Sequence, residues 1–85
     1  MSTELIHVGF DHFLALNRVI AIAAPGSAPI KRMVQQAKQE RRSIDLTSGR
    51  RTKAVVRLSD GEVALIAITP ETFAGRADSI HAAAD

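Results

Sequence analysis

Residues 53–72, KAVVRLSDGEVALIAITPET, decide the fold because two strands and the start of a helix follow one another without a gap. Residues 53–58 alternate as a strand does, with Ala54, Val56 and Leu58 on one face. Asp60-Gly61 then predicts a tight hairpin. Residues 62–68 form the second strand and are apolar on both faces, so we expect both faces to be buried.

The end of this stretch predicts a helix. Thr69 and Pro70 are residue types favoured at the N-cap and the first helical position. An apolar stripe follows at helical spacing and predicts the buried face of the helix; it consists of Phe73, Ala77 and Ile80, with Ala84 as a further candidate.

Upstream, residues 4–10 and 13–24 predict two strand regions. Ser27 is the expected N-cap of a helix that tolerates Pro29 in its first turn and ends near Arg41. A short strand at residues 44–46 and a turn at residues 47–51 lead into the returning strand at 53–58, so we expect these two strands to pair as a hairpin. The order strand, strand, helix, strand, strand, strand, helix indicates an α+β domain with a small, mainly antiparallel sheet and two helices. Because residues 13–24 are apolar on both faces and one helical layer covers one face, we expect a partner subunit on the other.

A chain of 85 residues supports one domain, residues 1–85, and one modest core. There is no Cys, and His7, His12 and His81 are scattered, so we expect neither disulfides nor a metal site, and no cofactor. Oligomerisation is then the remaining way to stabilise so small a domain. No apolar run approaches the roughly 20 residues of a membrane span, and the first residues do not resemble an export signal. We therefore expect a cytoplasmic protein that does not enter membranes.

The net charge of +2 conceals a strong polarisation. The segment from Arg18 to Arg57 holds ten Lys and Arg against two acids, Glu40 and Asp45, a charge of +8. The rest of the chain holds Arg76 against seven acids, a charge of −6. A surface polarised in this way favours a polyanionic partner over a merely solvated basic face.

The most informative motif is the turn that contains Arg50 and Arg51, with Gly49 before them and Lys53 after them. Two adjacent guanidiniums on a turn project into solvent, and the planar fork of each can donate two parallel hydrogen bonds to a phosphate. The alternative is a solvated turn without a ligand. Within the +8 segment, we favour contact with nucleic acid.

Three further basic residues are candidates. Arg18 precedes an apolar strand with no acid nearby in sequence. It is either a phosphate clamp beside the Arg50-Arg51 turn or an edge residue that keeps a sheet from aggregating. Lys31 and Arg32 occupy the first turns of the predicted helix, where the helix dipole disfavours cations unless an anion is bound too. We include all three in the predicted DNA-binding set.

Catalysis finds little support. The acids are dispersed at turns, caps and strand starts, and Asp11-His12 has no nucleophile placed beside it. We therefore predict that the protein is not an enzyme. A scaffold whose basic patch binds an acidic protein is the alternative, and an RNA binder is another, although the predicted sheet lacks the aromatic residues on which bases stack.

Six blocks of the sequence resemble the RemA family of small bacterial DNA-binding regulators, named for control of extracellular-matrix genes. The resemblance runs from about Leu5 to Phe73 without an obvious gap. Its blocks are LIHVGF (5–10), NRVI (17–20), SAPIKRM (27–33), Ile44-Asp45, TSGRRTKAVV (47–56) and PET (70–72).

The resemblance implies a ring-shaped homo-oligomer of seven or eight subunits that carries double-stranded DNA on a basic outer surface. By the same resemblance, Arg18, Arg50 and Arg51 contact DNA, and Pro29 has a structural or assembly role. The chain departs from the family pattern at Asp11-His12, where a Gly-Asn-like pair is expected, at Ser48 in place of a tyrosine, and at Arg42 in place of a small residue. We interpret Lys38, Arg41 and Arg42 as part of the solvated face of the helix, with extension of the basic patch as the alternative for Arg42.

Overall fold

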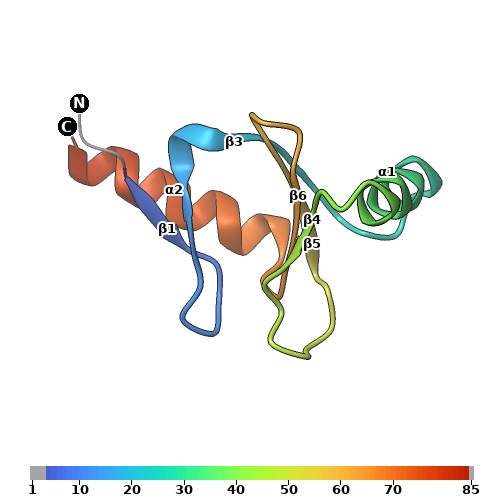
Figure 1. Ribbon diagram of the computed structural model, residues 1–85. Helices are drawn as coiled ribbons and strands as arrows, with labels where there is room; N and C mark the ends of the chain where they lie inside the picture. The colour runs from blue at the N-terminus through green and yellow to red at the C-terminus, as the bar shows by residue number, and fades with distance from the viewer. Residues whose placement is uncertain (1–3, 85) are drawn as a thin grey trace.

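The computed structural model describes residues 4–84, with the side chains described as far as His81, and its centre is a pair of antiparallel strands (Figure 1). These are β5 (Ala54–Leu58) and β6 (Val63–Ile66). They flank the turn at Asp60-Gly61, where Gly61 adopts φ +88° and its N–H donates to the Leu58 carbonyl over 3.0 Å. The hairpin expected from the sequence is confirmed.

Four strands form the main sheet, in the order β3-β5-β6-β4. The edge strand β3 (Val19–Ala23) pairs antiparallel with β5, and the other edge strand, β4 (Ser43–Asp45), pairs parallel with β6. A separate antiparallel pair consists of β1 (Leu5–His7) and β2 (Phe13–Ala15). The predicted α+β class is confirmed. The strands form two sheets, however, and one of their pairings is parallel.

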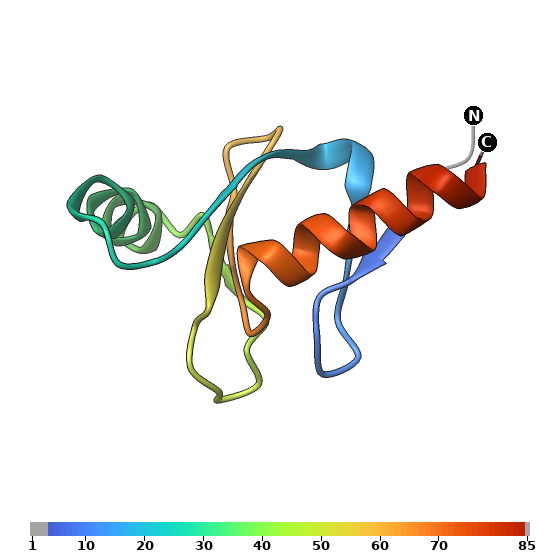
Figure 2. The same ribbon diagram turned by 180° about the vertical axis from the view of Figure 1, so that it is seen from behind.

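Helices cover both faces of the central strands, and the figures show them on opposite sides of the sheet (Figures 1 and 2). On one face Val55, Val63 and Leu65 pack with Ala37 of α1 (Ala28–Gln39). On the other, Val56 and Ile66 pack with Phe73 of α2 (Pro70–Ala84) and with the inner residues of β1 and β2. The alternation expected for residues 53–68 therefore holds. The chain itself covers both faces of β5 and β6, which contradicts the expectation of a single helical layer.

Residues 13–24 do not form one strand region. β2 ends at Ala15, and a 3-10 turn, η1 (Leu16–Arg18), precedes β3. Within β3 the register shifts between Val19 and Ala21, so Ile20 has no residue opposite it and 62% of its surface is exposed. This bulge places Val19 and Ile22 against the same core, although simple alternation puts them on opposite faces.

The turn at residues 47–51 does not join neighbouring strands. β6 lies between β4 and β5, so the chain passes across the end of β6 instead of folding back as a hairpin. The physical reason is the composition of β6, whose residues are all buried. A strand that is apolar on both faces is most stable at the centre of the sheet, with a pairing partner at each edge.

Both predicted helix starts are confirmed. The Ser27 hydroxyl accepts from the Ile30 N–H at 3.4 Å, and Pro29 lies in the first turn of α1. The Thr69 hydroxyl accepts from the Thr72 N–H at 3.1 Å at the start of α2. These caps satisfy backbone N–H groups that have no partner within the helix.

The helix α1 ends at Gln39, two residues before the expected end, in a left-handed turn. The N–H of Arg42 donates to the Ala37 carbonyl over 2.7 Å, and Arg41 adopts φ +56°. This is the Schellman arrangement, in which glycine usually occupies the left-handed position. Arginine has a Cβ and adopts this conformation only with strain.

Arg41→Gly should stabilise the folded protein by about 0.5–1 kcal/mol, because glycine adopts a positive φ without the Cβ clash. Arg41→Ala is the matched control, since it removes the same charge but keeps the Cβ. Urea unfolding of the two variants and the wild type measures the difference. Equal stability of the Gly and Ala variants would show that the backbone at Arg41 is not strained.

Candidate nucleic-acid interface

Two tight turns lie side by side at one edge of the molecule (Figure 1). In residues 9–12 both central residues have positive φ, +53° at Phe10 and +64° at Asp11. In residues 47–50 the central residues Ser48 and Gly49 have φ of +53° and +79°. Each turn closes with a backbone hydrogen bond, of 3.1 Å in the first and 3.0 Å in the second. Both therefore resemble type I′ turns, which bend tightly and project their central residues from the strands.

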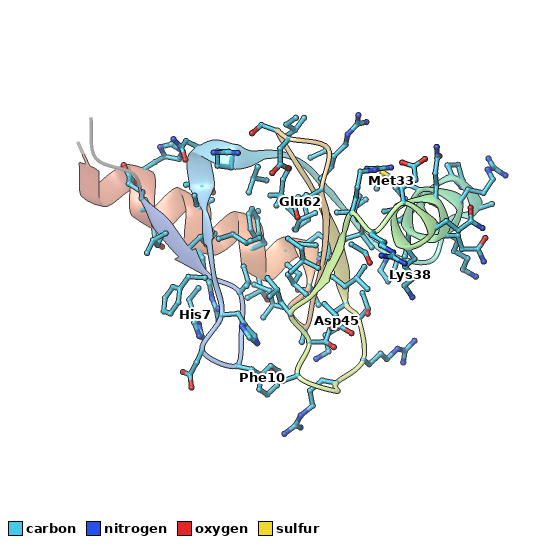
Figure 3. The ribbon with its side chains drawn as sticks, in the orientation of Figure 1. His7, Phe10, Met33, Lys38, Asp45 and Glu62 are labelled. Atoms are coloured by element: carbon cyan, nitrogen blue, oxygen red, sulfur yellow. The ribbon has the colours of Figure 1, made fainter. Side chains whose placement is uncertain are left out.

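Side chains connect the two turns. The Arg50 guanidinium carbon lies 4.8 Å from the centroid of the Phe10 ring, a cation–π distance. The His12 Nε2 atom lies 3.1 Å from the Ser48 hydroxyl oxygen. Figure 3 shows Phe10 between the turns. We call residues 9–12 and 47–51 together the paired turns.

The second of these turns is anchored at its base. The N–H of Leu46 donates to the Leu65 carbonyl over 2.8 Å, and the N–H of Lys53 donates to the Ile66 carbonyl over 2.9 Å. At the start of the turn, the Asp45 carboxylate accepts hydrogen bonds from the Thr47 hydroxyl at 2.6 Å and from the Thr47 N–H at 2.9 Å. These bonds hold the pKa of Asp45 below its usual value, since they stabilise the ionised form. The Arg50-Arg51 pair thus projects from a fixed support.

The cations of the turn carry no ion pair. Within residues 4–84, salt bridges occur only at Arg18 and Arg42, so Arg50, Arg51 and Lys53 are exposed and unneutralised by such a contact. Unpaired guanidiniums keep all their donors available to a phosphate.

Part of helix α1 extends this basic region. Lys31 and Lys38 line a groove of about 270 Å³ together with Thr52, which adjoins Arg51 in sequence. Lys31 therefore lies beside Thr52, the residue that follows the paired turns. Arg32 is exposed on α1 but does not line this groove.

The structure places Arg18 elsewhere. Its Nε–H donates to the Ser59 hydroxyl over 2.9 Å, and its guanidinium lies 3.8 Å from the Asp60 carboxylate, at the β5–β6 turn. The five residues of β5 separate that turn from Arg51, about 15 Å along the strand. Within one chain, Arg18 therefore does not lie beside the Arg50-Arg51 turn, and the interpretation of Arg18 as a phosphate clamp at that turn is wrong. An acid that is 42 positions away in sequence cannot be recognised as a partner of Arg18 before the strands pair.

Arg42 does not extend the basic patch. Its Nε–H donates to Glu40 Oε1 over 2.7 Å, its terminal nitrogen forms an ion pair with the same carboxylate, and it also donates to the Gly61 carbonyl. The hydrogen bond from Arg42, followed by that from Gln36, keeps the pKa of Glu40 below its usual value. Arg42 therefore fastens the end of α1 to the β5–β6 turn, and each of its three guanidinium nitrogens already has a partner.

The remaining predicted positions fall in different places. Gly49 has φ +79°, and a Cβ at this position would meet no other atom within 4 Å. A glycine is therefore favoured here by its backbone conformation and not by lack of space. Pro29 is exposed at the start of α1, away from the core. His12 contacts Ser48, whereas its neighbour Asp11 has no hydrogen bond within the described residues.

Within the described residues, no three His, Asp or Glu side chains come together as a metal site requires. In the same residues, neither helix is long and apolar enough to cross a bilayer.

Sequence reasoning missed Phe10, His12 and Lys38. The sequence pattern assigns Phe10 to the strand at residues 4–10, because Gly9 indicates only a bend or bulge there. The spacing of Phe10 and Arg50 in sequence carries no sign of their contact, which depends on how the two sheets pack. Lys38 resembles the solvated surface of a helix until the groove beside Thr52 is seen.

A family model described as RemA-like, extracellular matrix regulatory protein A-like, matches residues 5–77. The chain belongs to the RemA-like family. The resemblance carried by the six sequence blocks is thereby confirmed, and the paired turns carry parts of two of those blocks, residues 5–10 and 47–56.

Relatives of this RemA-like chain occur in distant bacteria. A protein of Dehalococcoides mccartyi is 51% identical over 76 residues, covering 89% of this chain and 79% of its own. A protein of Synechococcus elongatus is 49% identical over 76 residues, covering 89% and 87%, and one of a Thermoanaerobacter species is 47% identical over 79 residues, covering 93% and 82%. Each bears the name "putative regulatory protein", which describes regulation and not catalysis.

The support of the second turn should be sensitive to pH. Because hydrogen bonds from Thr47 lower the folded-state pKa of Asp45, they contribute stability above its unfolded-state pKa, and that contribution is lost as pH falls through the lower folded-state pKa. We expect Asp45→Ala to reduce stability at neutral pH by less than about 1 kcal/mol, since the carboxylate is exposed. In acid the difference from wild type should vanish.

Urea unfolding across a pH series measures this effect. Asp78→Ala is the control, because it removes another exposed carboxylate, on α2, that accepts no hydrogen bond from Thr47. If both variants lose the same stability at every pH, the Asp45–Thr47 bonds do not stabilise the turn.

Proposed function

We propose that this RemA-like protein is a regulator that binds double-stranded DNA as a ring-shaped homo-oligomer, in the cytoplasm and at the nucleoid. The observation that carries the proposal is the Arg50-Arg51 pair, which is exposed, lacks a salt bridge and stands on a turn anchored to β6. Arginine suits a phosphate backbone because its planar fork donates two parallel hydrogen bonds.

The basic surface supports contact along a chain of phosphates. Lys53 follows the turn directly, and Lys31 lies in the groove beside it, so one subunit offers cations from two elements. A single subunit should still bind weakly. Linking several copies raises the avidity by roughly 10² or more without any new kind of contact. Arg18 would act as a separate contact from the other end of β5, where Asp60 already offsets part of its charge.

Exposed apolar residues support self-association. Leu5 and Phe13 lie on the outer face of β1 and β2, opposite the buried Ile6 and Leu14, and are 60% and 55% exposed. Ile20, at the bulge of the edge strand β3, is 62% exposed. Large apolar side chains exposed in this way favour a protein contact, and a second copy of the chain is the partner that the family resemblance implies. Pro29, also exposed, is a further candidate for that contact.

The double variant Arg50→Ala/Arg51→Ala should form the same oligomer as the wild type and fail to shift duplex DNA. Light scattering after size exclusion measures the first property and a gel-shift titration the second. Arg41→Ala/Arg57→Ala is the matched control, because it removes two exposed arginines outside the paired turns. For the wild type, the log–log slope of affinity against salt should be about −0.9 per phosphate contacted.

Two outcomes would count against this site. If the double variant shifts DNA as the wild type does, the paired turns are not the contact. If an acidic protein binds the basic surface and duplex DNA does not displace it, the basic surface is a scaffold for acidic partners and not a DNA site.

Phe13→Asp should reduce the mass of the oligomer, because a charge on the outer face of β1 and β2 cannot be buried against a neighbour without a large desolvation cost. Phe13→Leu keeps the face apolar and should retain the wild-type mass. Light scattering distinguishes the two, and circular dichroism checks that both are folded. A monomeric wild type would overturn the ring, and an unchanged mass in Phe13→Asp would exclude this face from it.

A further inference from the structure

Phe10 is the one large aromatic side chain of the paired turns, and it stands in an unusual place. It is 44% exposed, so its ring is not there to fill the core. Its backbone lies in the left-handed region, at φ +53°, where a bulky residue is uncommon and glycine is unstrained. Neither burial nor turn geometry therefore accounts for a phenylalanine at this position.

The Phe10 ring contacts Arg50, which lies in the other of the paired turns. The guanidinium carbon lies 4.8 Å from the ring centroid. A guanidinium that lies flat over a ring keeps its five N–H donors in its own plane, pointing outward. The contact therefore restrains the side chain of Arg50 without using the donors that a phosphate would need.

Hydrogen bonds of the two turns hold Phe10 and Arg50 close to each other. His12 Nε2 and the Ser48 hydroxyl, 3.1 Å apart, join the first turn to the second. The second turn is held to the end of β6 by the bonds of Leu46 and Lys53. The turns that carry the Phe10 ring and the Arg50 guanidinium are thus held together before any ligand binds.

We propose that Phe10 is a positioning residue for DNA binding, whose ring holds the Arg50 guanidinium with its donor edges turned toward the phosphate backbone. The inference rests on the proposed DNA-binding function and adds the β1–β2 turn to the site. An arginine side chain carries about 2 kcal/mol of rotamer entropy, so ordering it in advance lowers the cost of binding. The effect acts on a phosphate contact and is independent of base sequence.

A double-mutant cycle tests the coupling, with a mixed-sequence duplex long enough to span several subunits as the probe. Phe10→Leu should weaken binding about two- to fivefold for each contacting subunit, the range of an exposed cation–π pair. The same substitution should weaken binding as much in an Arg51→Ala background and have no effect in an Arg50→Ala background, where the guanidinium is gone. Phe10→Tyr, which keeps the ring, should bind as the wild type does.

The salt dependence separates a positioning role from a direct role in binding phosphate. Phe10→Leu removes no charge, so its log–log slope should equal that of the wild type. The slope of Arg50→Ala should be shallower by about 0.9 for each phosphate that Arg50 neutralises. Should Phe10→Leu fail to fold, Phe10→Gly replaces it, because glycine fits φ +53° without strain. Light scattering confirms the oligomer in every variant.

Each outcome bears on a different claim. If Phe10→Leu binds as the wild type does, or weakens binding equally in all three backgrounds, Phe10 does not act through Arg50 and the inference is wrong. If Arg50→Ala itself leaves duplex binding unchanged, the proposed function fails at this site and the inference fails with it. Only a weakening confined to backgrounds that contain Arg50 supports the role of Phe10.

Discussion

The burial of β6 on both faces is the constraint on which the rest of the structure depends. All four of its residues are buried, so the strand requires a layer of side chains on each face and a pairing partner at each edge. α1 supplies one layer, and α2 with the β1–β2 pair supplies the other. With β4 and β5 on either side of β6, the connection between them must cross the end of that strand. Arg50 and Arg51 lie on this connection, so the packing of the core and the exposure of the arginines have one cause.

The same packing separates the arginines into two kinds. Arg18 meets a carboxylate that the fold brings to it, and Arg42 meets that of Glu40, two residues before it; both arginines are held at the β5–β6 turn. Among the residues that the structure describes, the Arg50 guanidinium meets an aromatic ring and no carboxylate, so the ring restrains it and its charge stays unneutralised. A charge that is ordered but unpaired is suited to an anionic ligand, whereas a charge in an ion pair contributes to the structure. The +8 segment is therefore not one uniform basic surface.

Much of the fold could be predicted because it depends on local patterns. The alternation of residues 53–68, the Asp60-Gly61 turn and the Ser27 and Thr69 caps each concern residues a few positions apart. Predictions that needed long-range pairing were wrong. β4 and β5 are not neighbours, and residues 13–24 are interrupted by η1 and a bulge. Arg42 donates a hydrogen bond to the Gly61 carbonyl, 19 residues away, which its sequence neighbours do not indicate. Phe10 was missed for the same reason, since Arg50 follows it by 40 residues.

The sequence by itself determined the family, through the six blocks that resemble it. It also determined the class of fold, the helix starts and the turn that carries Arg50 and Arg51, because periodicity, capping and turn chemistry act between near neighbours. Only the tertiary structure decided which cations stay unpaired and what holds them. Ion pairs and ring contacts require side chains to approach within a few ångströms. For Arg18 with Asp60 that approach exists only after β3 has paired with β5, and for Arg50 with Phe10 only after the two sheets have packed.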